Sequence, residues 1–271
     1  MEHGPVSPRS LVSARIEANR EISPGFFLMS IIVPEEYLAG NPGQFVMIRV
    51  KGIEAPLLGR PLSIHSLYPE GSRIICEFLY QVVGKGTSLL SGLNKGNEVL
   101  IMGPLGRGFS IIPDIQNVIL IAGGMGIAPL TYLAQHYRMR HPGTGIICYW
   151  GARTKEVLVD LERLRKSCAE IRVSTDDGSC GFRGSVTELF MRDMDRYPSD
   201  TAVYICGPVA MLKALKSALR NRFPVCEVSV EERMACGIGA CLGCAVRVEG
   251  GAYKKACKDG PVFSLSEVVC D

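Results

Sequence analysis

Residues 117–129 have the sequence NVILIAGGMGIAP, in which an apolar run passes into a glycine-rich turn. The run at 117–122 predicts a buried strand, and residues 128–140 predict a helix. Glycines between a strand and a helix let the backbone approach a pyrophosphate, which the N-terminus of the helix then stabilises. The stretch therefore favours a nucleotide-binding α/β domain, although a tight turn without a ligand would contain the same glycines.

This turn departs from the common dinucleotide fingerprint in two ways. Pro129 stands where the third glycine of the fingerprint is expected. No acidic residue closes the next predicted strand either, because Gly151, Ala152 and Arg153 follow it. The sequence therefore does not predict a standard Rossmann site.

Downstream of the turn, strand-like and helix-like segments alternate. Strands are predicted at residues 145–150, 170–175 and 201–206, and helices at 156–167, 185–194 and 209–221. Such alternation predicts a parallel, doubly wound sheet. We place this α/β domain at residues 113–224.

Upstream of the turn, the chain has the character of an antiparallel β-structure. Short β-rich runs occur at residues 11–18, 25–33, 44–50, 73–83 and 98–102. Turns rich in glycine, proline and asparagine separate them, for example at 41–43 and 69–71. Strands at this spacing predict a small antiparallel β-barrel, which we place at residues 8–112.

Two segments of the predicted barrel have residues suited to a flavin nucleotide. In Arg60-Pro61-Leu62-Ser63, the arginine can clamp a diphosphate and the serine can bond the edge of a flavin ring. Residues 84–88, GKGTS, open a predicted short helix whose N-terminus can take phosphate. A solvated or salt-bridged Arg60 at the surface is the alternative.

Four cysteines near the C-terminus, Cys236, Cys241, Cys244 and Cys257, have the spacing C-x4-C-x2-C-x12-C. This is the plant-type ferredoxin pattern, in which four thiolates hold a [2Fe–2S] cluster. A zinc site usually has two C-x2-4-C knuckles, whereas only Cys241 and Cys244 form such a pair here. The residues between the first three cysteines are nearly all small, so the backbone can wrap closely around sulfur. Zinc and incidental buried thiols are the alternatives.

The segment that contains these cysteines, residues 225–271, is predicted to form a small C-terminal module. It begins with a strand near residue 225. A hairpin is predicted at 245–248 and 253–256, with its turn at 249–251. The predicted fold is therefore multi-domain: a β-barrel, a parallel α/β domain and a cluster module.

Composition excludes several classes of function. The 271 residues, 47% of them hydrophobic, suffice for two domains and a small module, and the net charge of +3 gives no indication of a nucleic-acid partner. The most apolar run, 117–134, is interrupted by glycines and a proline, so we expect no membrane span. The N-terminus lacks a signal pattern, and the seven cysteines outside the quartet are most simply reduced thiols. These features favour the cytoplasm.

Together these motifs resemble the ferredoxin-reductase-like flavoprotein superfamily. Its members have a FAD barrel with an Arg-x-x-Ser motif, followed by an NAD(P) domain that opens with Gly-Gly-x-Gly-x-x-Pro. The domain later contains Cys-Gly-Pro, which is Cys206-Gly207-Pro208 here. With its cluster module, the chain is similar to the electron-transfer subunits of type B dihydroorotate dehydrogenase. The most specific stretches of this similarity are residues 174–179, 231–244 and 257–263.

The resemblance implies a role for each candidate residue. The cysteine quartet would bind one [2Fe–2S] cluster, and Cys206 would lie near the nicotinamide. Gly124 and Gly126 would approach NAD. One FAD would be held by Arg60, Pro61, Leu62 and Ser63 at its diphosphate and ring, by Leu79, Tyr80 and Gln81 beside the flavin, and by Gly86 and Thr87 at the diphosphate.

The resemblance also implies a reaction. A partner subunit would oxidise dihydroorotate at FMN, and this chain would relay the electrons through [2Fe–2S] and FAD to NAD+, in pyrimidine (UMP) biosynthesis. Two copies of each subunit would form a heterotetramer. We find no acid–base group for dihydroorotate in this chain, which agrees with a substrate site on the partner. Ile238 and Leu242 would face that partner, with core packing as the alternative.

Other interpretations stay open at this point. One is the flavin subunit of a sulfide dehydrogenase or of an NADH-dependent ferredoxin–NADP oxidoreductase; some of these have aspartate as the first cluster ligand, so Cys236 weighs against them. Another is a non-enzymatic redox-sensing or zinc-stabilised module without flavin, which the intact Arg60 and Ser63 argue against. The choice between NAD and NADP is also open, because Arg153 and Lys155 would either meet a 2′-phosphate or be solvated.

Overall fold

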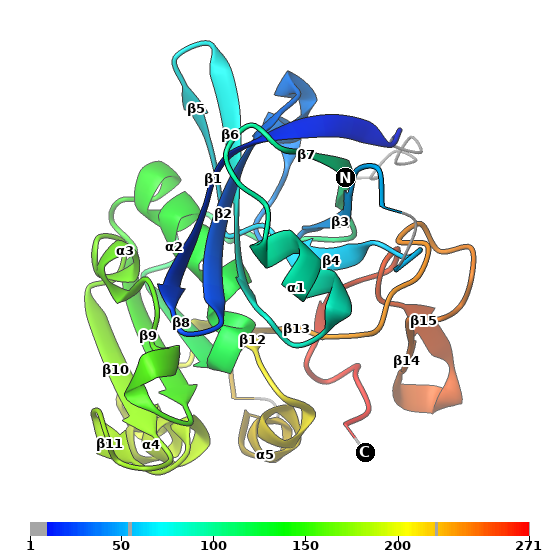
Figure 1. Ribbon diagram of the computed structural model, residues 1–271. Helices are drawn as coiled ribbons and strands as arrows, with labels where there is room; N and C mark the ends of the chain where they lie inside the picture. The colour runs from blue at the N-terminus through cyan, green and yellow to red at the C-terminus, as the bar shows by residue number, and fades with distance from the viewer. Residues whose placement is uncertain (1–9, 54–55, 220–221, 271) are drawn as a thin grey trace.

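The computed structural model describes residues 10–53, 56–219 and 222–270. Within these ranges the chain forms two seven-stranded sheets and one two-stranded hairpin. In Figure 1 the first sheet occupies the upper part of the molecule, the second the lower left, and the hairpin lies at the right. No helix in the described ranges is long and apolar enough to cross a membrane.

The first sheet is antiparallel and closes into a barrel. Its strands are β1 (Val12–Ser23), β2 (Phe26–Val33), β3 (Phe45–Val50), β4 (Arg60–Ser63), β5 (Ser66–Glu70), β6 (Arg73–Gln81) and β7 (Glu98–Leu105). They lie in the order β4-β3-β7-β1-β2-β6-β5. The two edge strands, β4 and β5, are consecutive in one segment, which pairs first with β3 and then with β6. This segment therefore joins the two edges of the sheet.

The antiparallel domain predicted from the sequence is confirmed, but its two edge strands were not predicted. β4 contains Pro61, and β5 contains Pro69, which indicated a turn. Neither strand shows a clear alternation of buried and exposed residues. Two further elements complete the barrel, the 3-10 helix η1 (Glu35–Ala39) and the helix α1 (Lys85–Ser91).

The second sheet is parallel except at one edge. Its strands are β8 (Asn117–Gly123), β9 (Gly145–Ala152), β10 (Glu170–Thr175), β11 (Phe182–Arg183), β12 (Ala202–Cys206), β13 (Val225–Ser229) and β16 (Val262–Ser264). They lie in the order β11-β10-β9-β8-β12-β13-β16, and only β16 is antiparallel to its neighbour. The strand order reverses between β8 and β12, and ligands bind outside the carboxyl ends of the strands at such a switch point.

Helices cover both faces of this sheet, as the alternation in the sequence predicted. On one face the core contains side chains of α2 (Ile127–Arg140) and α3 (Leu161–Arg165). On the other face it contains side chains of α4 (Val186–Asp193) and α5 (Val209–Leu219). The 3-10 helix η2 (Gly124–Gly126) precedes α2, and η3 (Lys155–Val157) precedes α3. A third, η4 (Met194–Arg196), follows α4.

Most predicted elements of this domain lie within a residue or two of the observed ones, with one marked difference. The helix predicted at 156–167 is instead η3 and the short helix α3, separated by Asp160 in the left-handed conformation with φ of 58°. The last residues of the helix predicted at 209–221, 220 and 221, lie outside the described residues.

The C-terminal segment is joined to the second sheet. Its predicted hairpin is confirmed as β14 (Ala245–Arg247) and β15 (Tyr253–Lys255), joined through η5 (Glu249–Gly251). β13 and β16 both belong to the second sheet, although they lie within the 225–271 segment expected to form the module. The segment between β13 and β16, which contains the cysteine loop and the hairpin, is thereby anchored at both ends to the second sheet.

Candidate functional site

A cavity of about 390 Å³, here called the inner cavity, lies where the barrel, the α/β domain and the cysteine segment meet. It brings together most of the residues that the sequence singled out. The barrel contributes residues 60–63 of β4, residues 79–81 of β6, and Thr87. The other parts contribute Cys206 at the end of β12 and Met234 before the first cluster cysteine.

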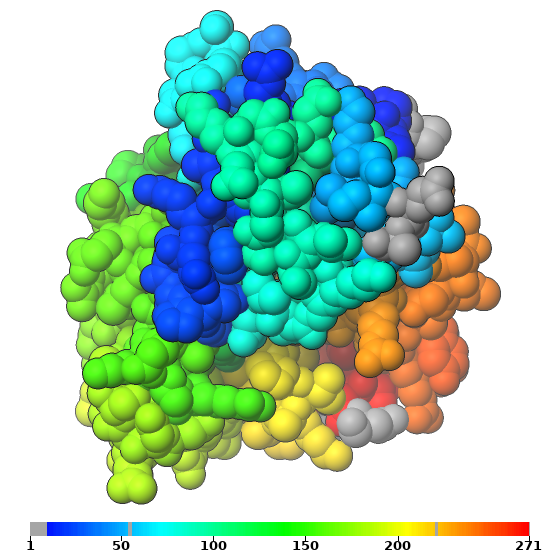
Figure 2. Space-filling model, viewed as in Figure 1, coloured from blue at the N-terminus to red at the C-terminus, as the bar shows by residue number. Residues whose placement is uncertain are grey.

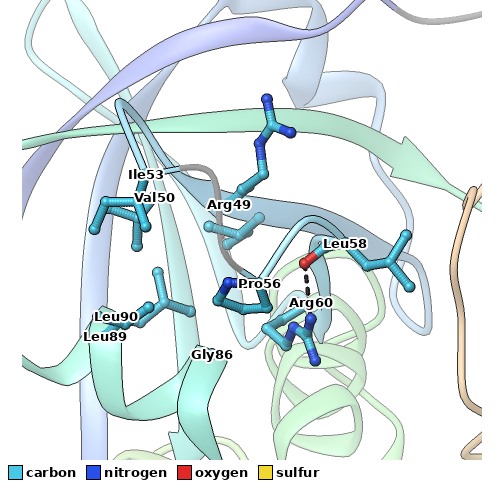
Figure 3. Close-up of a pocket in the computed structure, with 10 residues that line it drawn as sticks. Arg49, Val50, Ile53, Pro56, Leu58, Arg60, Gly86, Leu89 and Leu90 are labelled. Carbon is cyan, nitrogen blue, oxygen red and sulfur yellow. Dashed lines mark hydrogen bonds between the residues drawn. The ribbon is translucent and has the colours of Figure 1, made fainter.

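Arg60 lies beside Gly86, in the first turn of α1 (Figure 3). A Cβ atom on Gly86 would lie 2.8 Å from Arg60 Nε, so only glycine leaves room for the guanidinium there. Arg60 Nη2 donates a hydrogen bond to the carbonyl oxygen of Leu58 at 2.7 Å, whereas the buried Nε has no partner among the described residues. A buried donor without a partner is costly, and an anionic group such as a diphosphate would satisfy it. These residues therefore fit the group that the sequence predicted.

Thr87 shapes the neighbouring loop. Its Oγ1 accepts hydrogen bonds from the backbone N–H groups of Val83 at 3.0 Å and Gly84 at 3.2 Å. The same hydroxyl donates to the carbonyl oxygen of Gly84 at 3.0 Å. These three hydrogen bonds fix the loop that leads from β6 to α1.

A second cavity of about 1,050 Å³, here called the strand-end cavity, lies at the carboxyl ends of β8, β9, β10 and β12. Gly124, Arg153, Asp176 and Pro208 line it after these four strands. This is the switch point of the sheet, where a dinucleotide is expected. Three residues, Gln81, Val83 and Met125, line both cavities, so the two are direct neighbours.

The two glycines predicted to approach NAD have different surroundings. Gly124 has φ of 54° and open space around it, and its carbonyl oxygen accepts a hydrogen bond from Trp150 Nε1 at 3.0 Å. Gly126 is packed against β12, because a Cβ atom there would lie 2.1 Å from the carbonyl oxygen of Cys206. Gly124 thus faces the strand-end cavity, while Gly126 permits close contact between the β8 and β12 turns.

Cys206 lies in the wall of the inner cavity and is only 2% exposed. Burial, and then the nearby Glu231 carboxylate, raises the pKa of this thiol. The thiol is therefore protonated at neutral pH. It can shape the surface against which a nicotinamide stacks, but it is not activated as a nucleophile.

Sequence reasoning assigned no role to several residues of the inner cavity, among them Glu231 and Met234. Both follow β13, which pairs with β12, so they line the same cavity as Cys206. Partial desolvation in the cavity wall raises the pKa of the Glu231 carboxyl. An acid directly after the strand that adjoins the switch point is the signal that could have revealed it.

The four cysteines predicted as cluster ligands form two neighbouring pairs. The Cys236 and Cys241 side chains are within hydrogen-bonding reach of each other, as are those of Cys244 and Cys257. Among the described residues, no three His, Cys, Asp or Glu side chains are placed to hold a single metal ion. Two adjacent pairs of thiolates suit a cluster of two irons, each bound by two sulfurs.

Backbone N–H groups surround these sulfurs. The Gly239 N–H lies 3.1 Å from Cys257 Sγ, and the Cys257 N–H lies 3.4 Å from Cys244 Sγ. Burial opposes ionisation of Cys236, but the backbone N–H groups of Ile238, Cys241 and Ala240 outweigh it and lower the pKa of the thiol to about 6. Such donors stabilise the negative charge that an iron–sulfur cluster places on its ligands.

The cysteine loop rests directly on the barrel. Gly237 has φ of 73°, and a Cβ atom there would lie 2.6 Å from Met47 Cγ on β3. Phe45, on the same strand, lines the inner cavity. The cluster ligands and the inner cavity are therefore separated by little more than β3 and residues 234–237.

The outer side of the loop is apolar and open to solvent. Ile238 is 50% exposed and Leu242 is 63% exposed, so the core-packing alternative for these residues is wrong. Figure 2 shows the orange C-terminal part lying open on one side of the molecule.

Two family models match the chain. Residues 231–269 match the iron–sulfur cluster binding domain of dihydroorotate dehydrogenase B, and residues 120–217 match the NAD-binding domain of oxidoreductases.

Relatives and a solved structure agree with these matches. The dihydroorotate dehydrogenase B (NAD(+)) electron transfer subunit of Desulforamulus reducens is 40% identical over 94% of this chain and 97% of its own length. That of Clostridium acetobutylicum is 39% identical over 94% and 96%. The solved structure of an NADH-dependent reduced ferredoxin–NADP oxidoreductase is 31% identical, with a TM-score of 0.81 over 98% of this chain and 91% of that chain.

Proposed function

The chain belongs to the family of NAD+-linked dihydroorotate dehydrogenase B electron transfer subunits, and from this membership we propose the order of its electron route. Electrons enter from a dihydroorotate-oxidising partner at the cysteine loop and pass through a [2Fe–2S] cluster and FAD to NAD+. The observation that carries this order is the contiguity of the three sites. The cysteine loop packs on β3 beside the inner cavity, which shares Gln81, Val83 and Met125 with the strand-end cavity.

The inner cavity is proposed to hold the flavin. Arg60 and Gly86 would hold the diphosphate, because the unpaired Nε of Arg60 requires an acceptor. Residues 61–63 and 79–81 would border the ring, since they line the cavity. FAD, when bound, can accept electrons singly and release two of them as a hydride. Cys206, which also lines this cavity, would position the nicotinamide against it.

The strand-end cavity is proposed to hold NAD. Gly124 leaves its backbone open to the ligand, and Met125 borders both cavities. A dinucleotide that lies along the ends of β8 and β9 would thus reach the inner cavity with its nicotinamide end.

The partner is proposed to be an FMN-containing catalytic subunit, two copies of each chain forming a heterotetramer. The name of the relatives, electron transfer subunit, implies a catalytic subunit. We place the complex in the cytoplasm, because the seven cysteines outside the proposed cluster ligands are free thiols.

The apolar tip of the cysteine loop is the proposed contact with that partner, and a substitution there tests it. Leu242→Glu should weaken dihydroorotate-driven NAD+ reduction about tenfold or more in the reconstituted complex. NADH-driven reduction of a dye by this chain alone should not change. The matched control is Met139→Glu, at a residue that is 75% exposed on α2. Equal loss of both activities in the Leu242 variant, or equal effects of the two variants, would contradict the proposal.

A second candidate function follows from the similarity to the NADH-dependent reduced ferredoxin–NADP oxidoreductase. The partner discriminates between the two. If this chain forms an active complex with a type B catalytic subunit, dihydroorotate will reduce NAD+. If it functions only with a ferredoxin–NADP oxidoreductase subunit, dihydroorotate will not.

A further inference from the structure

The end of β9 lacks the acid that usually recognises the adenosine ribose of NAD. In dinucleotide-binding folds, an Asp or Glu after the second strand accepts a hydrogen bond from the ribose 2′-hydroxyl. Here the corresponding strand is β9, and Ala152 and Arg153 stand at its end. Another residue must therefore distinguish the 2′-hydroxyl of NAD from the 2′-phosphate of NADP.

The neighbouring strand supplies a carboxylate at the same place. β10 is parallel to β9, and Thr175 lies opposite Ala152 in the register. The next residue, Asp176, donates its backbone N–H to the carbonyl oxygen of Ala152 at 3.0 Å. Asp176 therefore lies beside the end of β9, and it lines the strand-end cavity together with Ala152 and Arg153.

Asp176 differs from the acids around it in having a free carboxylate. No hydrogen bond or ion pair to its carboxylate occurs within the described part of the chain. The carboxylate of Asp177 instead accepts hydrogen bonds from the backbone N–H and the hydroxyl of Ser179, at 2.9 and 2.7 Å. Glu188, also in the cavity wall, accepts a hydrogen bond from the backbone N–H of Ser185 at 2.9 Å as part of the cap of α4.

We propose that Asp176 is the specificity residue for NAD: its carboxylate accepts a hydrogen bond from the 2′-hydroxyl of the adenosine ribose and repels a 2′-phosphate. β10 thus supplies the acid that the end of β9 lacks. The proposal rests on the proposed placement of NAD in the strand-end cavity, and it is independent of the partner subunit.

A cation that follows β9 would favour a 2′-phosphate over a 2′-hydroxyl, which makes the proposal testable. Arg153 lines the cavity and would attract a 2′-phosphate. Lys155 does not line it, and its backbone N–H is bound to Ser179 Oγ at 2.9 Å. Once Asp176 is neutral, Arg153 should therefore be the group that binds a 2′-phosphate.

Binding of redox-inert fragments tests the proposal without any electron transfer. The dissociation constants of ADP-ribose and 2′-phospho-ADP-ribose can be measured by calorimetry on the holoprotein. The wild type should prefer ADP-ribose. Asp176→Asn should weaken ADP-ribose binding about tenfold, because a charged hydrogen-bond acceptor is lost, and should remove the preference. Arg153→Gln in the Asp176→Asn background should then weaken binding of the phosphorylated fragment.

Asp177→Asn is the matched control, because the carboxylate of Asp177 is engaged with Ser179 and does not line the cavity. This variant should keep the wild-type ratio of the two dissociation constants. The ratio of NADH- to NADPH-driven dye reduction should change in parallel. A wild type that prefers the phosphorylated fragment, or an unchanged ratio in Asp176→Asn, would overturn the proposal.

Discussion

His65 Nε2 lies 2.9 Å from Asp160 Oδ2, across the boundary between the barrel and the α/β domain. The other ring nitrogen, Nδ1, lies 3.1 Å from the carbonyl oxygen of Ala128. The imidazole of His65 therefore bridges Asp160 of the α/β domain and the backbone of α2. Arg163 completes the contact by binding Asp160 at 2.8 Å and Glu77 on the barrel. This buried network fixes the barrel against α2 and α3.

The first prediction concerns the stability of this domain contact. Burial opposes ionisation of Asp160, but the hydrogen bond from His65 and the charge of Arg163 outweigh it and lower the pKa of the carboxyl. Asp160→Asn should therefore reduce the free energy of unfolding by about 1–3 kcal/mol at pH 7. Because the pKa is lowered in the folded state, the contribution of Asp160 is complete above the ordinary value of 3.8 and is lost only as the pH falls through the lower folded value.

Urea unfolding of the wild type and Asp160→Asn at pH 7 and pH 5 measures this difference. It should be present at both pH values. Asp200→Asn, at an exposed carboxylate, should have no measurable effect. A variant as stable as the wild type at pH 7 would show that Asp160 does not hold the domains together.

The second prediction concerns the position of Arg60. In Gly86→Ala the new methyl group would meet Arg60 Nε at 2.8 Å, so the guanidinium must move from its place beside Gly86. We expect FAD affinity to fall about tenfold or more, which corresponds to one charged hydrogen bond. Fluorescence titration of the flavin-free protein with FAD measures the affinity. Gly84→Ala is the control, because nothing lies within 4 Å of its Cβ position and its backbone is extended. Equal FAD affinity in the two variants would contradict the prediction.

The third prediction concerns the packing of the cysteine loop against the barrel. Gly237→Ala would place a side chain in the left-handed region and against Met47 Cγ, 2.6 Å away. The loop must then lift from β3, and we expect less iron and sulfide per chain and faster cluster loss on warming. Gly243→Ala should retain the cluster, because the nearest atom to its Cβ position is Cys241 Sγ at 3.5 Å. Full iron content and unchanged cluster stability in Gly237→Ala would count against this packing.

The fourth prediction concerns the protonation of Cys206. Burial and Glu231 raise the pKa of the thiol, so the thiol should stay protonated even at pH values well above its ordinary pKa. NADH-driven dye reduction should accordingly show no step between pH 6 and pH 9 that Cys206→Ala removes. The rate loss in this variant should be well below the roughly 100-fold loss expected for a general acid or base. A fall in the rate at high pH that the wild type shows and Cys206→Ala lacks would assign Cys206 a proton-transfer role.

Local patterns in the sequence predicted much of this architecture. The run at 117–122 and the glycines after it predicted β8 and the turn at the switch point, because apolar length and backbone freedom are local properties. The cysteine spacing likewise predicted that four thiols meet at one site, and the structure brings these thiols together as two pairs.

Features that depend on distant parts of the chain were not predictable in this way. The barrel is closed by β4 and β5, whose pairing with β3 and β6 depends on distant strands and not on their own alternation. The helix expected at 156–167 is interrupted at Asp160, which is held by His65, 95 residues earlier in the chain. Glu231 reaches Cys206 only because β13 lies beside β12.

The most direct test of the proposed route is to remove the cluster while keeping the flavin. Wild type and Cys241→Ala, a substitution at an exposed ligand position, would each be reconstituted with FAD and an FMN-containing dihydroorotate dehydrogenase subunit. The wild type should reduce NAD+ with dihydroorotate. Cys241→Ala should lose this activity and keep NADH-driven dye reduction. Dihydroorotate-driven NAD+ reduction that survives without the cluster, or that is absent from a fully loaded wild-type complex, would contradict the account.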